Sequence, residues 1–240
     1  MKRIFCVVVC SLMAFSATIT FAQTARKFHF GLHASPNLSW LKPDVQQPKY
    51  SSDGTIIGMS YGAAFENFFS PNLGIGTGVN VMSTGGKLSF TDAININVNN
   101  VITSDTGIMT RKYKLQYVEV PLFLIGSTGE VLGNFSFYGK FGLSSAFRIK
   151  AKADDEYTPS TGSVITAKSV NIDKEVSFFR EAMIIGLGCA YKFGQVAALY
   201  AGVTYNNGFT DVLKGANNAY PTVKEKARSN FVELNIGVMF

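Results

Sequence analysis

The feature that most constrains this chain is an alternation of apolar residues with small or polar ones, sustained over segments of about ten residues. In the segment 73–82, Leu, Ile, Thr, Val and Val occupy every second position, and glycine or asparagine occupies most positions between them. A β-strand points successive side chains to opposite faces, so this pattern predicts strands with one apolar face. We place eight such strands at 27–38, 56–69, 73–82, 112–125, 133–149, 178–193, 197–209 and 230–240.

The apolar faces carry no charged residue in the three segments where the alternation is cleanest, 73–82, 133–149 and 230–240. A lipid-facing surface requires this, because a Lys or Arg at the bilayer midplane costs roughly 2–4 kcal/mol. The 23 glycines, the 20 phenylalanines and a charged fraction of 16% favour strands over a helical bundle or a disordered chain. A closed barrel can lie in lipid, because closure pairs every backbone amide.

The connections separate a membrane barrel from a soluble β-sandwich, which also alternates. Short links at 70–72, 126–132 and 194–196 alternate with long ones rich in Ser, Asn, Asp, Lys and Gly. Short turns in the periplasm and long loops outside are typical of outer-membrane barrels. The sequence therefore predicts an all-β, eight-stranded antiparallel up-and-down transmembrane β-barrel in the outer membrane of a Gram-negative bacterium.

The first 22 residues have the pattern of a secretory signal peptide. Two positive charges precede a long apolar stretch, and Thr20 and Ala22 supply a small-x-small ending. We expect cleavage before Gln23, which leaves 23–240 as the barrel domain. An uncleaved anchor and a lipoprotein are the weaker alternatives.

Charge and cysteine content exclude several classes of function. Loss of Cys6 and Cys10 with the signal leaves Cys189 as the only thiol, so neither an intramolecular disulfide nor a cysteine metal cluster is possible. The formal charge of +6 falls to about +4 without Lys2 and Arg3, and no basic helix or aromatic-spaced patch is present, so no nucleic-acid binding is predicted. We expect no cofactor and no metal.

The segment QYVEVPLFLIG places a carboxylate and a proline inside an apolar run. In the predicted register, Val118, Val120, Leu122 and Leu124 face lipid, and the four residues Tyr117, Glu119, Pro121 and Phe123 face the lumen. Because proline lacks an amide proton, we expect a bulge or a bend at Pro121.

Charged residues on the inward faces form a predicted lumen charge layer. A symmetric turn between the fourth and fifth strands would place Glu119 opposite Lys140, and barrel closure would bring His33 towards Glu233. The layer fits either a salt-bridged plug that fixes the register, which we favour, or a gated ion path. His29 and His33 are too far apart along one strand, at some 13 Å, to share a metal ion. The predicted layer consists of His33, Glu66, Glu119, Lys140, Arg180 and Glu233.

Aromatic residues gather at the strand ends, where they predict two interfacial girdles. The C-terminal Phe240 is typical of the signal by which the barrel assembly machinery recognises its clients. The periplasmic girdle is predicted from Phe28, Phe68, Phe69, Tyr191, Phe193 and Phe240, and the outer one from Trp40, Phe178, Phe179, Tyr205, Phe209 and Phe231.

The chain resembles the PorT-like outer-membrane β-barrel family of the Bacteroidetes. The resemblance rests on YKLQYVEVPLFLIG, on NFSFYGKFGLSSAFRIKAKADD, on GLGCAYKF and on the terminal aromatic residue. It implies residence in the outer membrane and, for the family's namesake, a part in protein export by type IX secretion. It transfers no catalytic, cofactor or metal residue. The motif positions in this chain are Tyr117, Glu119, Pro121 and Leu122.

These observations favour a non-catalytic barrel, surrounded by outer-membrane lipid, that engages a protein partner through its long extracellular loops or its periplasmic turns. The partner would belong to a secretion assembly or to the cell surface. The alternative is a narrow pore for ions or small solutes. An outer-leaflet lipid enzyme is disfavoured, because only His29 and His33 could serve as the catalytic histidine.

Overall fold

The structure is a computed structural model that describes residues 28–44, 50–98, 101–131, 133–160, 163–194 and 197–240. The predicted signal peptide and its cleavage site lie outside these residues. Within these ranges, no helix is long and apolar enough to cross a membrane. The barrel strands are β1 (Phe28–Pro43), β3 (Ile56–Ser70), β4 (Leu73–Val98), β5 (Val101–Ser127), β6 (Phe135–Thr158), β8 (Phe179–Phe193), β9 (Ala197–Asp211) and β10 (Ala227–Met239).

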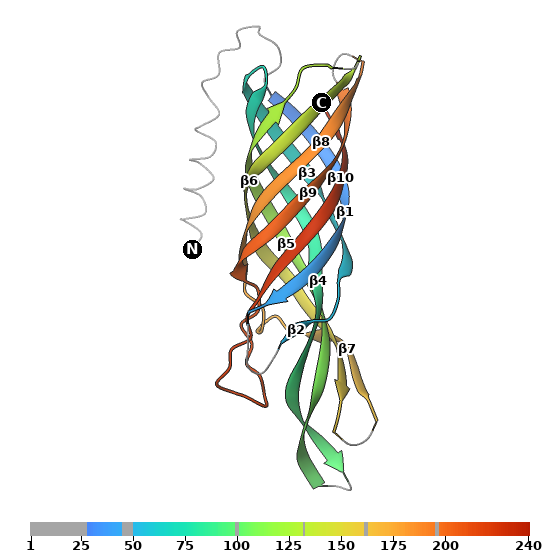
Figure 1. Cartoon of the computed structure of the whole chain (residues 1–240), viewed down its shortest axis with the longest axis vertical. Helices are drawn as coiled ribbons and strands as arrows, with labels where there is room; N and C mark the ends of the chain where they lie inside the picture. Colours follow the sequence, from blue (N-terminus) through green and yellow to red (C-terminus); the bar gives the residue numbers. More distant parts are fainter. Residues whose placement is uncertain (1–27, 45–49, 99–100, 132, 161–162, 195–196) are drawn as a thin grey trace, which may run out of the picture.

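The eight strands close into an antiparallel ring, which confirms the predicted up-and-down barrel (Figure 1). Each strand pairs with its neighbours in the chain, and β1 closes the ring by pairing with β10. Phe30 of β1 and Phe240, which follows β10, extend this seam through two backbone hydrogen bonds of 3.0 and 2.7 Å. The C-terminus lies at the end of the barrel that carries the short turns, which is the periplasmic end.

The two faces of the strands differ as the alternation predicts. On β5, the lipid-facing Leu122 is 58% exposed, whereas the next residue, Phe123, is 6% exposed and faces the lumen. Tyr117 and Glu119 share the lumen face and are buried, and Leu124 is exposed to lipid. The motif residues therefore have the predicted orientations.

The strands continue much further beyond the membrane than predicted (Figure 1). The region 83–111, expected as a loop, is a β-hairpin in which β4 and β5 pair as far as Val98 and Val101. Likewise β6 extends to Thr158 and pairs there with the short strand β7 (Ile165–Asn171). Alternation continues through Leu88, Phe90, Ile94 and Ile96, but the region is also rich in Asn, Ser, Thr and Asp, and from that composition a loop was expected. A further short strand, β2 (Ser51–Ser52), pairs with β4.

Aromatic residues mark the outer edge of the lipid-facing belt. Trp40 stacks on Tyr205 with ring centroids 6.3 Å apart. Phe147 contacts Phe178 and Phe179 at centroid distances of 5.9 and 5.4 Å. These contacts lie on outward faces at the extracellular ends of the strands, where aromatic rings favour the membrane interface.

Two residues assigned to the girdles face the lumen instead. Phe231 is only 1% exposed and lies under the guanidinium of Arg180, 5.4 Å from its ring centroid. Phe68 packs against the buried Phe123 and Ile125. Both predictions were wrong because these aromatic residues occupy the inward-facing positions of β10 and β3.

Pro121 does not cause the predicted bulge. The β4–β5 ladder skips this proline and keeps the same register on either side, because a missing amide proton removes a bond to only one neighbour. Thr77 Oγ1 donates to the Pro121 carbonyl at 2.8 Å across the gap. The register shift in the pairing of β5 with β6 lies between Gln116 and Tyr117.

Candidate functional site

A cavity of about 690 Å³ occupies the periplasmic half of the lumen. All eight barrel strands line it, and it reaches residues of the periplasmic turns such as Glu130 and Asn134. Its upper limit is set by inward side chains that include Glu119, Asn80 and Asn206. The lumen is therefore hollow towards the periplasm.

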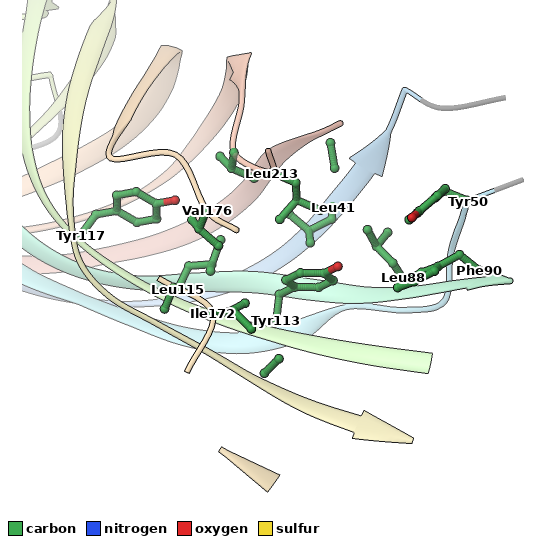
Figure 2. Packing of buried hydrophobic residues seen from close by; sticks show 14 of the residues in the cluster. Leu41, Tyr50, Leu88, Phe90, Tyr113, Leu115, Tyr117, Ile172, Val176 and Leu213 are labelled. Carbon is green, nitrogen blue, oxygen red and sulfur yellow. The ribbon is translucent and has the colours of Figure 1, made fainter. Parts of the chain in front are cut away.

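The extracellular half of the lumen is filled by apolar and aromatic side chains (Figure 2). Tyr113, Leu115 and Tyr117 point inward from β5 and are at most 1% exposed. Val176 and Leu213 come from the segments before β8 and after β9, join the same cluster and form an isolated β-bridge. Close packing of this kind leaves no room for a water-filled channel. The outer mouth of the barrel is closed by this cluster, which we call the outer core.

Arg180 and Glu119 are buried directly below the outer core. The side-chain amide of Asn206 lies between them and hydrogen-bonds to both. The guanidinium of Arg180 donates to Asn206 Oδ1 at 2.5 Å, and Asn206 Nδ2 donates to Glu119 Oε1 at 3.1 Å. Arg180 also donates to the Ser229 carbonyl at 2.9 Å. Buried charges are tolerated where hydrogen bonds replace water, and Asn206 provides one to each charge.

A second asparagine connects Glu119 to His33. Asn80 Nδ2 donates to Glu119 Oε2 at 3.3 Å, which leaves Asn80 Oδ1 as an acceptor for His33 Nε2 at 2.9 Å. Since Nε2 is then the donor, a neutral His33 accepts from Ser35 Oγ at Nδ1, 3.1 Å away. Both ring nitrogens of His33 are therefore engaged.

A third asparagine holds the lysine of the layer. Lys140 Nζ donates to Asn235 Oδ1 at 3.1 Å, and Thr204 Oγ1 donates to the same oxygen at 2.6 Å. Asn235 Nδ2 in turn donates to Ser35 Oγ at 3.2 Å, which joins this group to His33. Asparagines thus link Arg180, Glu119, His33 and Lys140 into one continuous hydrogen-bond network.

The pairings predicted within the charge layer are wrong. In the β5–β6 register, Gly126 lies opposite Gly139 instead of Gly133, because the turn is centred later in the chain. This shift places Ala146, not Lys140, opposite Glu119.

At the barrel seam the predicted contact also fails. Gly237 lies opposite His33, whereas Glu233 lies opposite Asn37. No ion pair within 4.0 Å joins two members of the layer in the part of the chain that the structure describes. Glu66 and Glu233 line the cavity with Lys140.

Outside the membrane, the ends of β4 and β5 form a two-stranded ribbon. Among the described residues, β4 beyond Ser89 pairs only with β5, and β5 before Ile108 pairs only with β4. We call residues 93–98 and 101–106 the outer ribbon (Figure 1). The segment 212–226 is fixed to its base, because Asn218 donates from its backbone amide to Asp92 at 2.8 Å.

A salt-bridge cluster supports the base of the ribbon. Arg111 donates to both carboxylate oxygens of Asp155, at 2.7 and 2.9 Å, and to Glu175 at 2.7 Å. Burial by itself would lower the Arg111 pKa, but the hydrogen bond to Asp155 and the two carboxylate charges hold this pKa above its usual value. Arg111 is therefore a permanent cation that ties β5 to β6 and to the segment before β8.

A family model described as the outer membrane protein beta-barrel domain matches residues 21–214 of the chain. The chain belongs to this family. The barrel, its lipid-facing belt and this match place it in the outer membrane of a Gram-negative bacterium. No curated protein matches the chain.

The chain is similar to several solved outer-membrane proteins at low sequence identity. Neisserial surface protein A is 15% identical, with 90% of this chain and 98% of that chain covered and a TM-score of 0.43. OprG from Pseudomonas aeruginosa is 11% identical, with 88% and 94% covered and a TM-score of 0.47. Ail of Yersinia pestis is 12% identical, with 89% and 99% covered and a TM-score of 0.38.

Several residues that organise this outer-membrane barrel were not singled out from the sequence. Asn80 and Asn235 could be recognised as inward polar positions, but their role as links depends on distances across the lumen. Arg111 and Glu175 lie in regions expected to be loops, so no pattern connected them. In the described residues, no group of three or more His, Cys, Asp or Glu side chains is arranged to hold a metal ion.

Proposed function

We propose that this outer-membrane barrel is a non-catalytic binding protein that engages a protein partner through its outer ribbon. The observation that carries the proposal is the pairing of β4 and β5 beyond the barrel. Among the described residues no strand pairs with either outer edge of the ribbon, although Tyr157 covers the β5 edge at the Asp105 carbonyl. An exposed strand edge offers backbone N–H and C=O groups to an added strand. The partner would therefore bind by β-strand addition.

The closed outer mouth supports a surface function over a pore. A solute that entered the cavity from the periplasm would meet the outer core, where Tyr113, Tyr117 and Val176 have no exposed surface. Conduction would require these side chains to leave a closely packed cluster. The narrow-pore alternative therefore needs a second conformation.

Enzymatic chemistry has little support in the lumen. His33 contacts Ser35, but that serine is fully buried and already accepts from Asn235. The residues of the family motif face either lipid or the lumen. Its one carboxylate, Glu119, accepts hydrogen bonds from the side-chain amides of Asn80 and Asn206. In our proposal, His33, Ser35 and Glu119 stabilise the barrel and take no part in catalysis.

The resemblance to PorT-like barrels supports a partner in protein secretion. In that setting the outer ribbon would contact another component of the secretion assembly, and Phe240 at the barrel seam would serve as the assembly signal during insertion. A partner at the cell surface, for adhesion, is the alternative within the same proposal.

The experiment that tests the proposal shortens the ribbon without changing the barrel. Asp92 and Gly107 lie directly opposite each other, so a two-residue Asn-Gly turn between them can replace residues 93–106 and keep the register. We expect this variant to insert normally, as shown by heat-modifiable gel migration, and to lose secretion or surface attachment in the native bacterium. As a matched control, Ser163 and Val164 before β7 are replaced by glycine and serine, which keeps Ser160 and its hydrogen bonds to Asp105 of the ribbon. Normal secretion and attachment by the shortened variant would contradict the proposal.

A further inference from the structure

Five lysines form a patch on the outer wall of the barrel. Lys87, Lys112, Lys114, Lys150 and Lys152 lie at outward-facing positions of β4, β5 and β6, and we call them the lysine patch. The register places Lys87 opposite Lys112 and Lys114 opposite Lys152. Like charges directly opposite on neighbouring strands repel each other, so this arrangement costs stability unless an anion lies between them.

The protein supplies little negative charge to the patch. Asp154 forms a salt bridge with Lys114, and among the described residues no other carboxylate lies within 4.0 Å of a patch lysine. Lys114 remains 44% exposed at its side chain in spite of this contact. The patch therefore presents a net positive charge to its surroundings.

The patch lies just outside the lipid-facing belt. On β6, the exposed Phe147 and Ile149 precede Lys150 and Lys152 on the same outer wall. Lys150 is three positions after Phe147, which is about 10 Å along a strand and less along the membrane normal because barrel strands are tilted. Lysine stems can extend along the wall and place their ammonium groups among the lipid headgroups. Since the long hairpins are extracellular, these headgroups belong to the outer leaflet.

A groove beside the patch combines charge with apolar surface. Its volume is about 370 Å³, and four of the five patch lysines line it together with Ile56, Ile57 and Leu115. Ile57 is 83% exposed, which is high for a large apolar side chain. Such a groove fits a ligand that has both an anionic head and an apolar body, and it fits a freely soluble anion poorly.

We propose that the lysine patch binds the phosphate groups of an outer-leaflet glycolipid. The phosphates lie between the paired lysines and relieve their repulsion, while the adjoining part of the glycolipid covers Ile57. Anionic lipid at a membrane surface contributes through every nearby cation, so the affinity falls with each lysine that is removed. The patch is on the barrel wall, separate from the outer ribbon, so this lipid site does not depend on the proposed partner binding.

The test uses the full mature chain, refolded in detergent and placed in phosphatidylcholine nanodiscs. Nanodiscs contain either diphosphoryl lipid A or lipid A from which both phosphates have been removed, and native mass spectrometry counts the lipid A retained by the protein. We expect retention of the phosphorylated form only. The double variant Lys114→Gln with Lys152→Gln should weaken retention about fivefold for each lysine removed.

The matched control is Lys224→Gln with Lys226→Gln, which removes two exposed lysines from the segment 212–226. We expect it to retain lipid A as the unmodified protein does. Equal retention of phosphorylated and dephosphorylated lipid A, or equal losses in the two double variants, would overturn the proposal. If the Lys114 and Lys152 variant does not fold by gel migration, Lys150→Gln tests the same site, with about a fivefold loss expected. Undiminished retention by that variant would also overturn the proposal.

Discussion

Arg180 and Glu119 do not form a salt bridge; Asn206 lies between them, accepts a hydrogen bond from the guanidinium at 2.5 Å and donates one to the carboxylate at 3.1 Å. Both charges are buried, and Arg180 has no exposed surface. A charge buried in this way is stable only while its hydrogen-bond partners remain. The amide of Asn206 therefore controls how both charges are held.

We predict that Asn206→Ala destabilises the barrel by about 3 kcal/mol, because it removes a partner from two buried charges at once. Urea unfolding in lipid vesicles measures the loss, with the fluorescence of Trp40 as the reporter. Trp40 is the only tryptophan and stacks on Tyr205 beside the mutated position. Asn67→Ala, at an exposed position of β3, is the control and should change stability by less than about 0.5 kcal/mol. A loss at Asn206 no larger than in this control would show that the network does not hold the charges.

We predict that the extracellular segment 212–226 loosens as the pH rises. Glu225 is buried against Tyr50, and burial raises the Glu225 pKa to about 7 from an ordinary value of 4.5. Because the folded pKa is the higher one, the packing is most stable below about pH 4.5 and weakens until about pH 7. The total loss is about 3 kcal/mol.

Hydrogen exchange of the amides in 212–226, corrected for the intrinsic rate, measures this effect between about pH 5 and about pH 8. In Glu225→Gln the group no longer titrates, so the corrected protection should become independent of pH. Protection in the unmodified protein that stays constant or increases with pH would contradict the prediction.

We predict that Arg111→Met releases the base of the outer ribbon. The substitution leaves Asp155 and Glu175 without their shared cation and should cost about 3 kcal/mol, because this pair is largely buried. Faster hydrogen exchange in β7 and in the extracellular part of β6 reports the loss. Lys192→Met breaks the exposed pair with Glu130 and should cost less than about 1 kcal/mol. Similar effects of the two substitutions would show that the Arg111 cluster has no special role.

The strands and their faces could be predicted because the period of two is a local property. The orientations of Tyr117, Glu119 and Leu122 follow from it and are confirmed. Register is not local, because it depends on where each turn is centred and on the stagger of the closed barrel. The predicted contact between Glu119 and Lys140 was wrong for this reason.

The closure of the outer mouth could not be predicted from alternation. Val176 and Leu213 lie outside the regular strands, and only the folded chain brings them over the lumen. The outer ribbon was missed although Ile94, Ile96 and Val98 occupy every second position, because the surrounding residues have the polar composition of a loop. Polar strands and polar loops have similar compositions, so pairing distinguishes them only in three dimensions.

The central claim is that this barrel works through its outer surface and that its lumen does not conduct. Single-channel recording of the refolded protein in a planar bilayer tests it most directly, with heat-modifiable migration as proof of folding. We predict no conductance steps from folded protein, because the outer core closes the lumen. Stable steps that change in size or selectivity in Glu119→Gln or Lys140→Met would contradict the claim and make the charge layer part of a pore.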